Sequence, residues 1–456
     1  MPKEKPELSE AMRKKMGGKT FVKNPIPKFL GNSAKIAAAG ILFNKLSATT
    51  KKYNSWDGEI KVALVGCGGR GTGAAIQAIA ADRDVRLVAI ADVFKNQAQS
   101  CLNALVEKYG DSEQLSVMEE TIFIGFDAYK KAIDIADVVI LTTPPGFRPQ
   151  HFTYAVENNK HVFMEKPVAT DPNGIRRVLK AAKLAEQKKL NVVVGLQRRY
   201  EKKYLALYNR INKGDIGKIV SGQVYWNGAG VWVRKRESGQ TEMEYQMRNW
   251  YYFNWICGDH IVEQHIHNID VANWFIGEYP KSATGMGGRE VRKGIDHGQI
   301  FDHHYVEFNY PGGAVISSQC RHQPGTNRNV SEVFQGTKSN VYTKPKSKIV
   351  DHSGNDLFIY DSIGDKSPYQ IEHDELFKSI RSGGVINNAE YGAKTTLTAI
   401  MGRMATYTGK EITWEQALNS NHILVPDNLD WDSIPPVIPD ENGKYPVPVP
   451  GVTKIS

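Results

Sequence analysis

Short apolar runs and helical patterns alternate along the first half of the chain after about residue 59. Runs typical of strands that are covered on both faces lie at 59–65, 85–90, 136–141, 161–164 and 191–195. Segments with helical spacing of apolar positions lie at 74–81, 152–158 and 171–188. Because strands that alternate with helices are typical of βαβ units, this half is predicted to be α/β, with a parallel sheet of the Rossmann type.

A different pattern occupies the second half. Strand-like segments lie at 220–226, 305–310 and 314–319, and helical segments at 258–276, 368–382 and 390–407. We expect an α+β domain built on a large, mostly antiparallel open sheet. The last residues, 426–456, are rich in proline, which neither continues helices nor donates ladder hydrogen bonds. We expect them to form an extended C-terminal strap over a domain or a partner subunit.

The composition is that of an ordinary globular protein. Of the 456 residues, 41% are hydrophobic and 23% are charged, which excludes wholesale disorder. The formal net charge is +9, but residues 1–28 alone carry eight Lys or Arg against three Glu. Because nucleic-acid binding needs a basic face on the folded body, this distribution makes no case for nucleic acid.

A basic leader, residues 1–58, precedes the first strand. Its apolar run, 36–43, is much shorter than the roughly 20 residues of a membrane-spanning helix, so we expect no integral membrane protein. A basic region followed by a short apolar run has the layout of an export signal. Lys28-Phe29-Leu30 resembles the core of a twin-arginine signal, with Ile26-Pro27 where its arginines would stand. Two interpretations stay open: a signal for the bacterial periplasm, or an arm of a cytoplasmic protein.

A glycine-rich loop joins the first strand to the first helix and fits G-x-G-x-x-G. The loop residues expected at a cofactor are Gly66, Gly68, Gly69, Arg70 and Gly71. Such glycines allow a tight turn and let the backbone approach a pyrophosphate at a helix N-terminus. Asp92 ends the second strand, where a carboxylate accepts hydrogen bonds from a ribose and repels a 2′-phosphate. The loop therefore predicts a binding site for NAD, with NADP disfavoured. The alternative interpretation is a glycine turn in an unrelated α/β protein.

Two later strands add candidates for the same site, because ligands of open parallel sheets bind beyond the carboxyl ends of the strands. The residues at these ends that we expect to contact the cofactor are Thr143, Pro144, Arg148, Glu165 and Lys166.

These motifs in combination resemble the glucose–fructose oxidoreductase / inositol dehydrogenase / rhizopine catabolism (Gfo/Idh/MocA) family, over residues 59–415. The matching motifs are the glycine fingerprint, Thr143-Pro144, Glu165-Lys166-Pro167, Gly195 with Arg198-Arg199, and Glu263-x-x-x-His267. The chain departs from the family at Pro145 and Arg148, where Asn and His are common, and at Glu263, where Asp is usual.

The resemblance implies a division of the chain into domains. Residues 59–190 would form an NAD-binding Rossmann domain, and residues 191–425 a substrate-binding and oligomerisation domain. Its late helices would pack back on the Rossmann domain. The open sheet would pair subunits into a homo-oligomer, either a dimer or a tetramer.

Titratable residues gather on one side of the helix predicted over 258–276. At 100° per residue, the residues within an arc of about 80° are His260, Glu263, His267, Asp270 and Trp274. The resemblance implies that Lys166, Glu263 and His267 are catalytic. His267 would remove a hydroxyl proton, Lys166 would stabilise the same oxygen, and Glu263 would orient groups. The alternative is an ion pair on an exposed helix face.

A metal site is a further interpretation of the histidine-rich segments 260–267 and 297–304. Alternate residues of a helix diverge by about 200°, so His265 and His267 do not reach one ion there. His303 and His304 point to opposite faces of a strand. We therefore predict no metal.

Aromatic residues are concentrated in the second domain, where five of the eight tryptophans fall within 226–274. Rings with polar groups between them suit a saccharide, whose C–H faces stack on rings while its hydroxyls bind donors. The residues predicted to bind such a substrate are Arg199, Arg248, Trp250, His260 and Arg321.

Three functions remain open at this level. The leading one is an NAD-dependent oxidoreductase acting on a secondary hydroxyl of a sugar, polyol or glycoside, including the 3-hydroxyl of a glycoside. The second is a glycosidase that uses NAD for transient oxidation, elimination and hydride return. The third is a catalytically silent NAD-binding paralogue.

Overall fold

The computed structural model describes residues 56–454. The predictions for the leader, including its export signal and its location, therefore lie outside the described residues, apart from the last few. Within the described residues, no helix combines the length and the apolar character needed to cross a membrane.

The first half forms a six-stranded sheet of order β3-β2-β1-β4-β5-β6 in which every pair is parallel. Its strands are β1 (Ile60–Val65), β2 (Val85–Asp92), β3 (Ile122–Ile124), β4 (Val138–Leu141), β5 (His161–Met164) and β6 (Val192–Val194). The helices between them are α1 (Gly69–Ala81), α2 (Lys95–Tyr109), α3 (Ala128–Asp134), α4 (Arg148–Glu157) and α5 (Pro172–Gln187). This order confirms the Rossmann prediction.

The second half forms a nine-stranded sheet of order β14-β13-β12-β11-β7-β10-β9-β8-β15. All its pairs are antiparallel except β7 with β10, so the mostly antiparallel sheet is confirmed. Its strands are β7 (Ile219–Gly228), β8 (Ser282–Gly288), β9 (His303–Asn309), β10 (Val315–His322), β11 (Asn329–Gly336), β12 (Ser339–Tyr342), β13 (Lys348–Asp351), β14 (Asp356–Ile359) and β15 (Ile412–Thr413).

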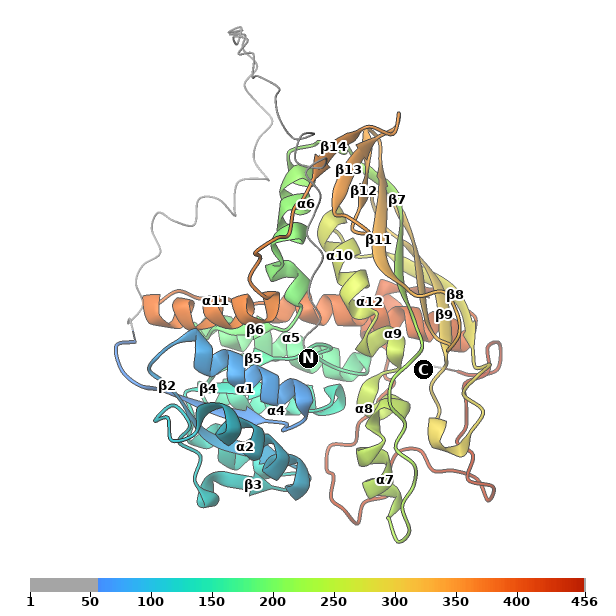
Figure 1. Cartoon of the computed structure of the whole chain (residues 1–456). Coiled ribbons are helices and arrows are strands. Elements are labelled where there is room, and N and C mark those ends of the chain that lie inside the picture. The colour runs from blue at the N-terminus through green and yellow to red at the C-terminus, as the bar shows by residue number, and fades with distance from the viewer. Residues whose placement is uncertain (1–55, 455–456) are drawn as a thin grey trace, which may run out of the picture. The chain divides into compact units, whose positions relative to one another are not determined.

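Helices of the second half connect the two sheets. They are α6 (Lys202–Asn212), α7 (Glu242–Arg248), α8 (Asn254–Cys257), α9 (His260–Glu263), α10 (Ile266–Ile276), α11 (Pro368–Ser382), α12 (Ala389–Thr408) and α13 (Trp414–Asn419). The buried helix α12 contacts α5 and β6 on one side and β8 and β9 on the other, while α11 packs on α1 (Figure 1). The late helices thus lie against the Rossmann half.

The single helix predicted over 258–276 is wrong in one respect, because the structure divides it into α9 and α10. At the break, the His265 amide donates to the His260 carbonyl, five residues back, and the His267 amide to the Gln264 carbonyl, three residues back. α9 and α10 are therefore not one continuous helix, and the arc that placed His260 and Glu263 on the same side as His267 does not extend across the break.

Candidate active site

The glycine loop brings three backbone segments into close contact. Gly66 has φ +101°, and a Cβ atom there would lie 2.5 Å from the Thr143 amide nitrogen. A Cβ atom at Gly71 would overlap the Gly66 carbonyl oxygen. Gly68 and Gly69 face open space at the start of α1. The loop therefore leaves its surface and the helix N-terminus open to a pyrophosphate, which is the fit expected for NAD.

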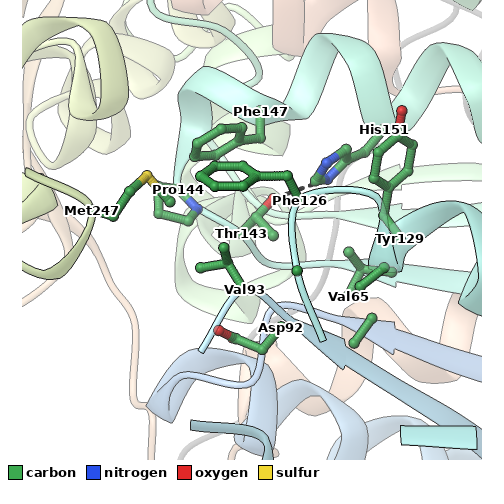
Figure 2. Close-up of a pocket in the computed structure, with 13 residues that line it drawn as sticks. Val65, Asp92, Val93, Phe126, Tyr129, Thr143, Pro144, Phe147, His151 and Met247 are labelled. Atoms are coloured by element: carbon green, nitrogen blue, oxygen red, sulfur yellow. Dashed lines mark hydrogen bonds between the residues drawn. The ribbon is translucent and has the colours of Figure 1, made fainter. Parts of the chain in front are cut away.

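A cavity of about 420 Å³ lies beside this loop (Figure 2). Asp92, Thr143 and Pro144 line it, together with the rings of Phe126 and Phe147. The Asp92 carboxylate accepts hydrogen bonds from the amides of Cys67 (2.7 Å) and Phe94 (2.8 Å). Its burial raises the pKa of Asp92. A mainly apolar cavity with aromatic rings in its lining, next to a fixed carboxylate, suits the adenosine half of NAD.

Arg70 is held by two carboxylates from distant parts of the chain. Its Nε donates to Glu165 Oε1 at 2.5 Å and one terminal nitrogen to Glu372 Oε1 at 3.1 Å. Gly195 leaves room for the Glu165 carboxylate, because a Cβ atom there would lie 2.8 Å from Glu165 Oε1. Glu372 was not among the residues predicted for this site, since no local pattern relates a residue of α11 to the glycine loop.

Arg148 lies buried at the carboxyl ends of β4 and β5. Its side chain is 1% exposed, and it donates from Nε to the Glu165 carbonyl (2.8 Å) and from one terminal nitrogen to the Leu141 carbonyl (2.9 Å). Burial lowers the pKa of Arg148 to about 10. The guanidinium braces the chain where β4 and β5 end, and the Leu141 carbonyl also accepts from the Glu165 amide at 2.9 Å. This burial does not favour a direct cofactor contact for Arg148.

Lys166 and Glu263 lie in contact, although 97 positions separate them. The Lys166 ammonium donates to the Glu263 carbonyl oxygen at 2.6 Å and to Glu263 Oε1 at 3.0 Å. Both side chains are largely buried, with 12% and 14% exposed. A lysine has three N–H donors, so this arrangement leaves one for another oxygen.

His267 belongs to the same site. Its ring is 7% exposed and stacks on the Trp226 ring at 6.0 Å between centroids, and its Nδ1 has no hydrogen-bond partner among residues 56–454. Burial, and next the charge of Lys166, lower the pKa of His267 well below its ordinary value. The imidazole is therefore neutral near pH 7 and able to accept a proton. From the sequence, Trp226 was identified only as part of the aromatic-rich segment. The alternation of side chains along β7 was the pattern that could have placed its ring on the face toward the site.

The five residues predicted to bind substrate make contacts within the protein or are buried. Arg199 forms a bidentate ion pair with Asp270, with both distances 2.8 Å, under the Tyr391 ring. Arg248 pairs with Glu237 at 2.5 Å, and Trp250 packs edge-on against Trp232.

Of the remaining two, Arg321 donates to the Asn327 carbonyl at 2.7 Å, while His260 is completely buried. In the part of the chain that the structure describes, none of the five hydrogen-bonds to Lys166, Glu263 or His267. The geometry does not favour direct substrate contact for Arg199 or His260, because Arg199 is paired with Asp270 and His260 is completely buried.

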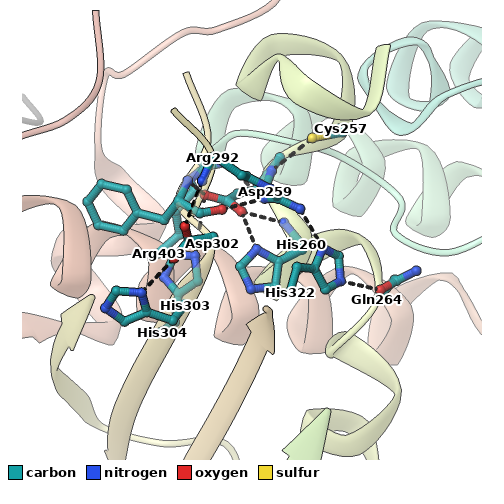
Figure 3. Close-up of polar contacts among 12 residues, drawn as sticks. Cys257, Asp259, His260, Gln264, Arg292, Asp302, His303, His304, His322 and Arg403 are labelled. Carbon is teal, nitrogen blue, oxygen red and sulfur yellow. Dashed lines mark hydrogen bonds and ion pairs between the residues drawn. The ribbon is translucent and has the colours of Figure 1, made fainter. Parts of the chain in front are cut away.

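A buried polar network centred on Asp259 positions α9 (Figure 3). Asp259 Oδ1 accepts from the His260 amide and ring, and Oδ2 from the Phe301 amide (2.9 Å) and the Tyr407 hydroxyl (2.5 Å). His322 meets Gln264 at 2.8 Å, in the break between α9 and α10. The network fixes the two helix ends that carry Glu263 and His267.

The same network contains the one group of potential metal ligands found among residues 56–454: Asp259, His260 and His304, with ligand atoms within 4.8 Å of one another. Of the two histidine-rich segments considered from the sequence, each contributes one member, His260 and His304. A metal would have to displace donors that already occupy both Asp259 oxygens. We therefore describe the group as a hydrogen-bond network.

Comparisons with known proteins agree with this geometry. Residues 60–196 match the model of an oxidoreductase family with an NAD-binding Rossmann fold, and residues 204–341 match the GFO/IDH/MocA C-terminal domain. An inositol 2-dehydrogenase of Rhizobium meliloti is 26% identical over 284 residues, covering 62% of this chain and 74% of the relative.

Two solved structures share the fold. Scyllo-inositol dehydrogenase from Lactobacillus casei, with bound NAD(H) and scyllo-inositol, has a TM-score of 0.59 at 18% identity, covering 78% of this chain and 99% of that one. Aldose-aldose oxidoreductase from Caulobacter crescentus has a TM-score of 0.62 at 16% identity, with the same coverage. With both its domains matched and its cofactor loop intact, the chain belongs to the Gfo/Idh/MocA family of NAD-binding oxidoreductases.

Proposed function

We propose that this oxidoreductase transfers hydride between nicotinamide and a secondary hydroxyl of a polyol or sugar. The observation that carries the proposal is the contact between Lys166 and Glu263 beside the unpartnered Nδ1 of His267. The name of the Rhizobium relative, inositol 2-dehydrogenase, supports a cyclic polyol as the first substrate to try.

The residues divide the work of alcohol oxidation among them. The third N–H of Lys166 hydrogen-bonds the substrate oxygen and stabilises its negative charge as the proton leaves. The neutral His267 ring accepts that proton. Glu263 holds the ammonium in place through two acceptors, its carbonyl and its carboxylate. NAD, held by the glycine loop and Asp92, supplies the hydride acceptor.

The substrate class follows from the same surroundings. Trp226 offers a ring beside His267, which suits the C–H face of a cyclic polyol or pyranose. A glycoside oxidised at its 3-hydroxyl presents the same face and the same alcohol. We therefore include glycosides among the candidate substrates.

A panel of inositols, aldoses and nitrophenyl glycosides tests the proposal, with each compound scored for reduced-nicotinamide absorbance and for nitrophenol release. Net nicotinamide reduction that disappears in Lys166→Ala and His267→Ala is the expected result. Nitrophenol release without net reduction would overturn it in favour of an NAD-recycling glycosidase. NAD binding without either signal on the whole panel would overturn it in favour of a silent paralogue.

A further inference from the structure

The C-terminal strap crosses the molecule as irregular chain that is fastened at separate points. Just before it, the amides of Leu424 and Val425 donate to Asp171 Oδ2, at 2.7 and 3.3 Å, where α5 of the Rossmann half begins. Farther on, Gln246 of α7 donates to the Val437 carbonyl at 2.6 Å. In Figure 1 this red segment passes close to α7. The strap thus joins the Rossmann half to the substrate half.

Between these two anchors, the strap presents Trp431 to the Rossmann half. Its ring lies 5.3 Å from the Phe94 ring and 5.0 Å from the Phe126 ring, between centroids. Phe126 lines the cavity beside Asp92, and Phe94 directly follows Val93, another lining residue (Figure 2). Trp431 therefore stands against the rim of the cavity assigned to adenosine.

The segment between these two anchors makes few polar contacts with the Rossmann half. The one ion pair found there among the described residues, Arg177 with Asp427, is long at 3.9 Å. Ile434 is 80% exposed. This part of the strap can lift without breaking either sheet, because the contacts it loses are mainly those of Trp431 and its apolar neighbours.

We propose that the strap retains NAD, with Trp431, Phe94 and Phe126 forming the outer wall of the adenosine site. The inference rests on NAD binding, which the family establishes, and is independent of which alcohol is oxidised. An adenine ring entering the cavity gains an aromatic wall. NAD then leaves only when residues 426–436 lift, so that the strap slows its dissociation.

Binding measurements on the full chain test this role with Trp431→Ala and, as a matched strap control, Ile434→Ala. The probes are NAD, AMP, which carries only the adenosine half, and nicotinamide mononucleotide, which lacks it. In Trp431→Ala we expect the Kd of NAD and AMP to rise about tenfold, with most of the change in the dissociation rate. Nicotinamide mononucleotide should bind unchanged, and Ile434→Ala should stay within about twofold for all three probes.

Two results would overturn the proposal. One is NAD and AMP binding by Trp431→Ala within twofold of the unsubstituted protein. The other is an equal loss for all three probes, which indicates general damage. Limited proteolysis of the unsubstituted protein gives a second measurement that does not depend on the variant's folding. AMP should protect bonds in 426–436, and cleavage there at an unchanged rate would contradict a retaining strap.

Discussion

The Lys166 ammonium and the His267 ring are neighbours whose charges affect one another. Burial and the positive charge of Lys166 both favour the neutral form of His267, so its pKa lies below the ordinary 6.5. A base with a lowered pKa stays deprotonated at pH 7 and loses function only when the pH falls through that lowered value.

We therefore expect kcat/KM to be level around pH 7, with its acid limb below pH 6.5. In Lys166→Met the like charge is gone, so the pKa of His267 should rise and the acid limb should move to higher pH. The same variant should lose about 100-fold or more in kcat. A pH–rate profile whose acid limb is unchanged in Lys166→Met would contradict this coupling.

Arg148 is expected to contribute to the stability of the fold. Arg148→Leu removes the donor found for the Glu165 carbonyl and one of the two donors at the Leu141 carbonyl, so the free energy of unfolding should fall by about 1–3 kcal/mol. Urea denaturation measures the change. Arg83→Ala is the matched control, because that side chain is 93% exposed and its loss should alter stability by no more than about 0.5 kcal/mol. Similar losses in both variants would argue against a bracing role.

At the scale of elements, the effect of an alanine substitution at the junction of β1 with α1 depends on which glycine is changed. Gly71→Ala would force a methyl group into the Gly66 carbonyl, and we expect it to cost about 2 kcal/mol or more and to weaken NAD binding. Gly69→Ala adds a methyl group in open space at the first position of α1 and should be neutral or stabilising by up to about 1 kcal/mol. Thermal unfolding of the two variants checks whether Gly71→Ala lowers stability while Gly69→Ala does not, and NAD titration of Gly71→Ala checks the weakened binding.

Elements differed in how far local pattern could predict them. The ranges 161–164 and 368–382 match β5 and α11, because their apolar periodicity and flanking breakers are local signals. The break between α9 and α10 could not be predicted, because Asp259 is held by Phe301 and Tyr407, which are distant in sequence. The apolar periodicity is continuous across 258–276, so it gave no sign of these long-range contacts.

At the scale of the whole molecule, the two halves share their apolar cores. Leu376, Phe377 and Ile380 of α11 pack in one cluster with Ile60 and Val62 of β1. Buried residues of α12 likewise join a cluster that includes both sheets. Neither half buries its apolar surface alone, so removing one exposes the core of the other.

We expect the two halves to unfold together in denaturant. Of the eight tryptophans only Trp56 precedes residue 200, so tryptophan fluorescence reports mainly on the second half, whereas far-ultraviolet circular dichroism reports on both. The two signals should give coincident transitions. A circular dichroism transition in two steps, with only one matched by fluorescence, would show independent halves.

The sequence by itself determined the fold class and the cofactor loop, because each depends on local periodicity or on a short motif, and the family resemblance of its motifs singled out Lys166, Glu263 and His267 as candidates. Only the tertiary structure decided how these residues meet, since segments 97 positions apart form the Lys166–Glu263 contact. It also decided that Arg148 braces two strand ends and that the Trp431 ring packs on Phe126 beside the cavity next to Asp92. Burial and hydrogen-bond partners are properties of packing, and no spacing along the chain encodes them.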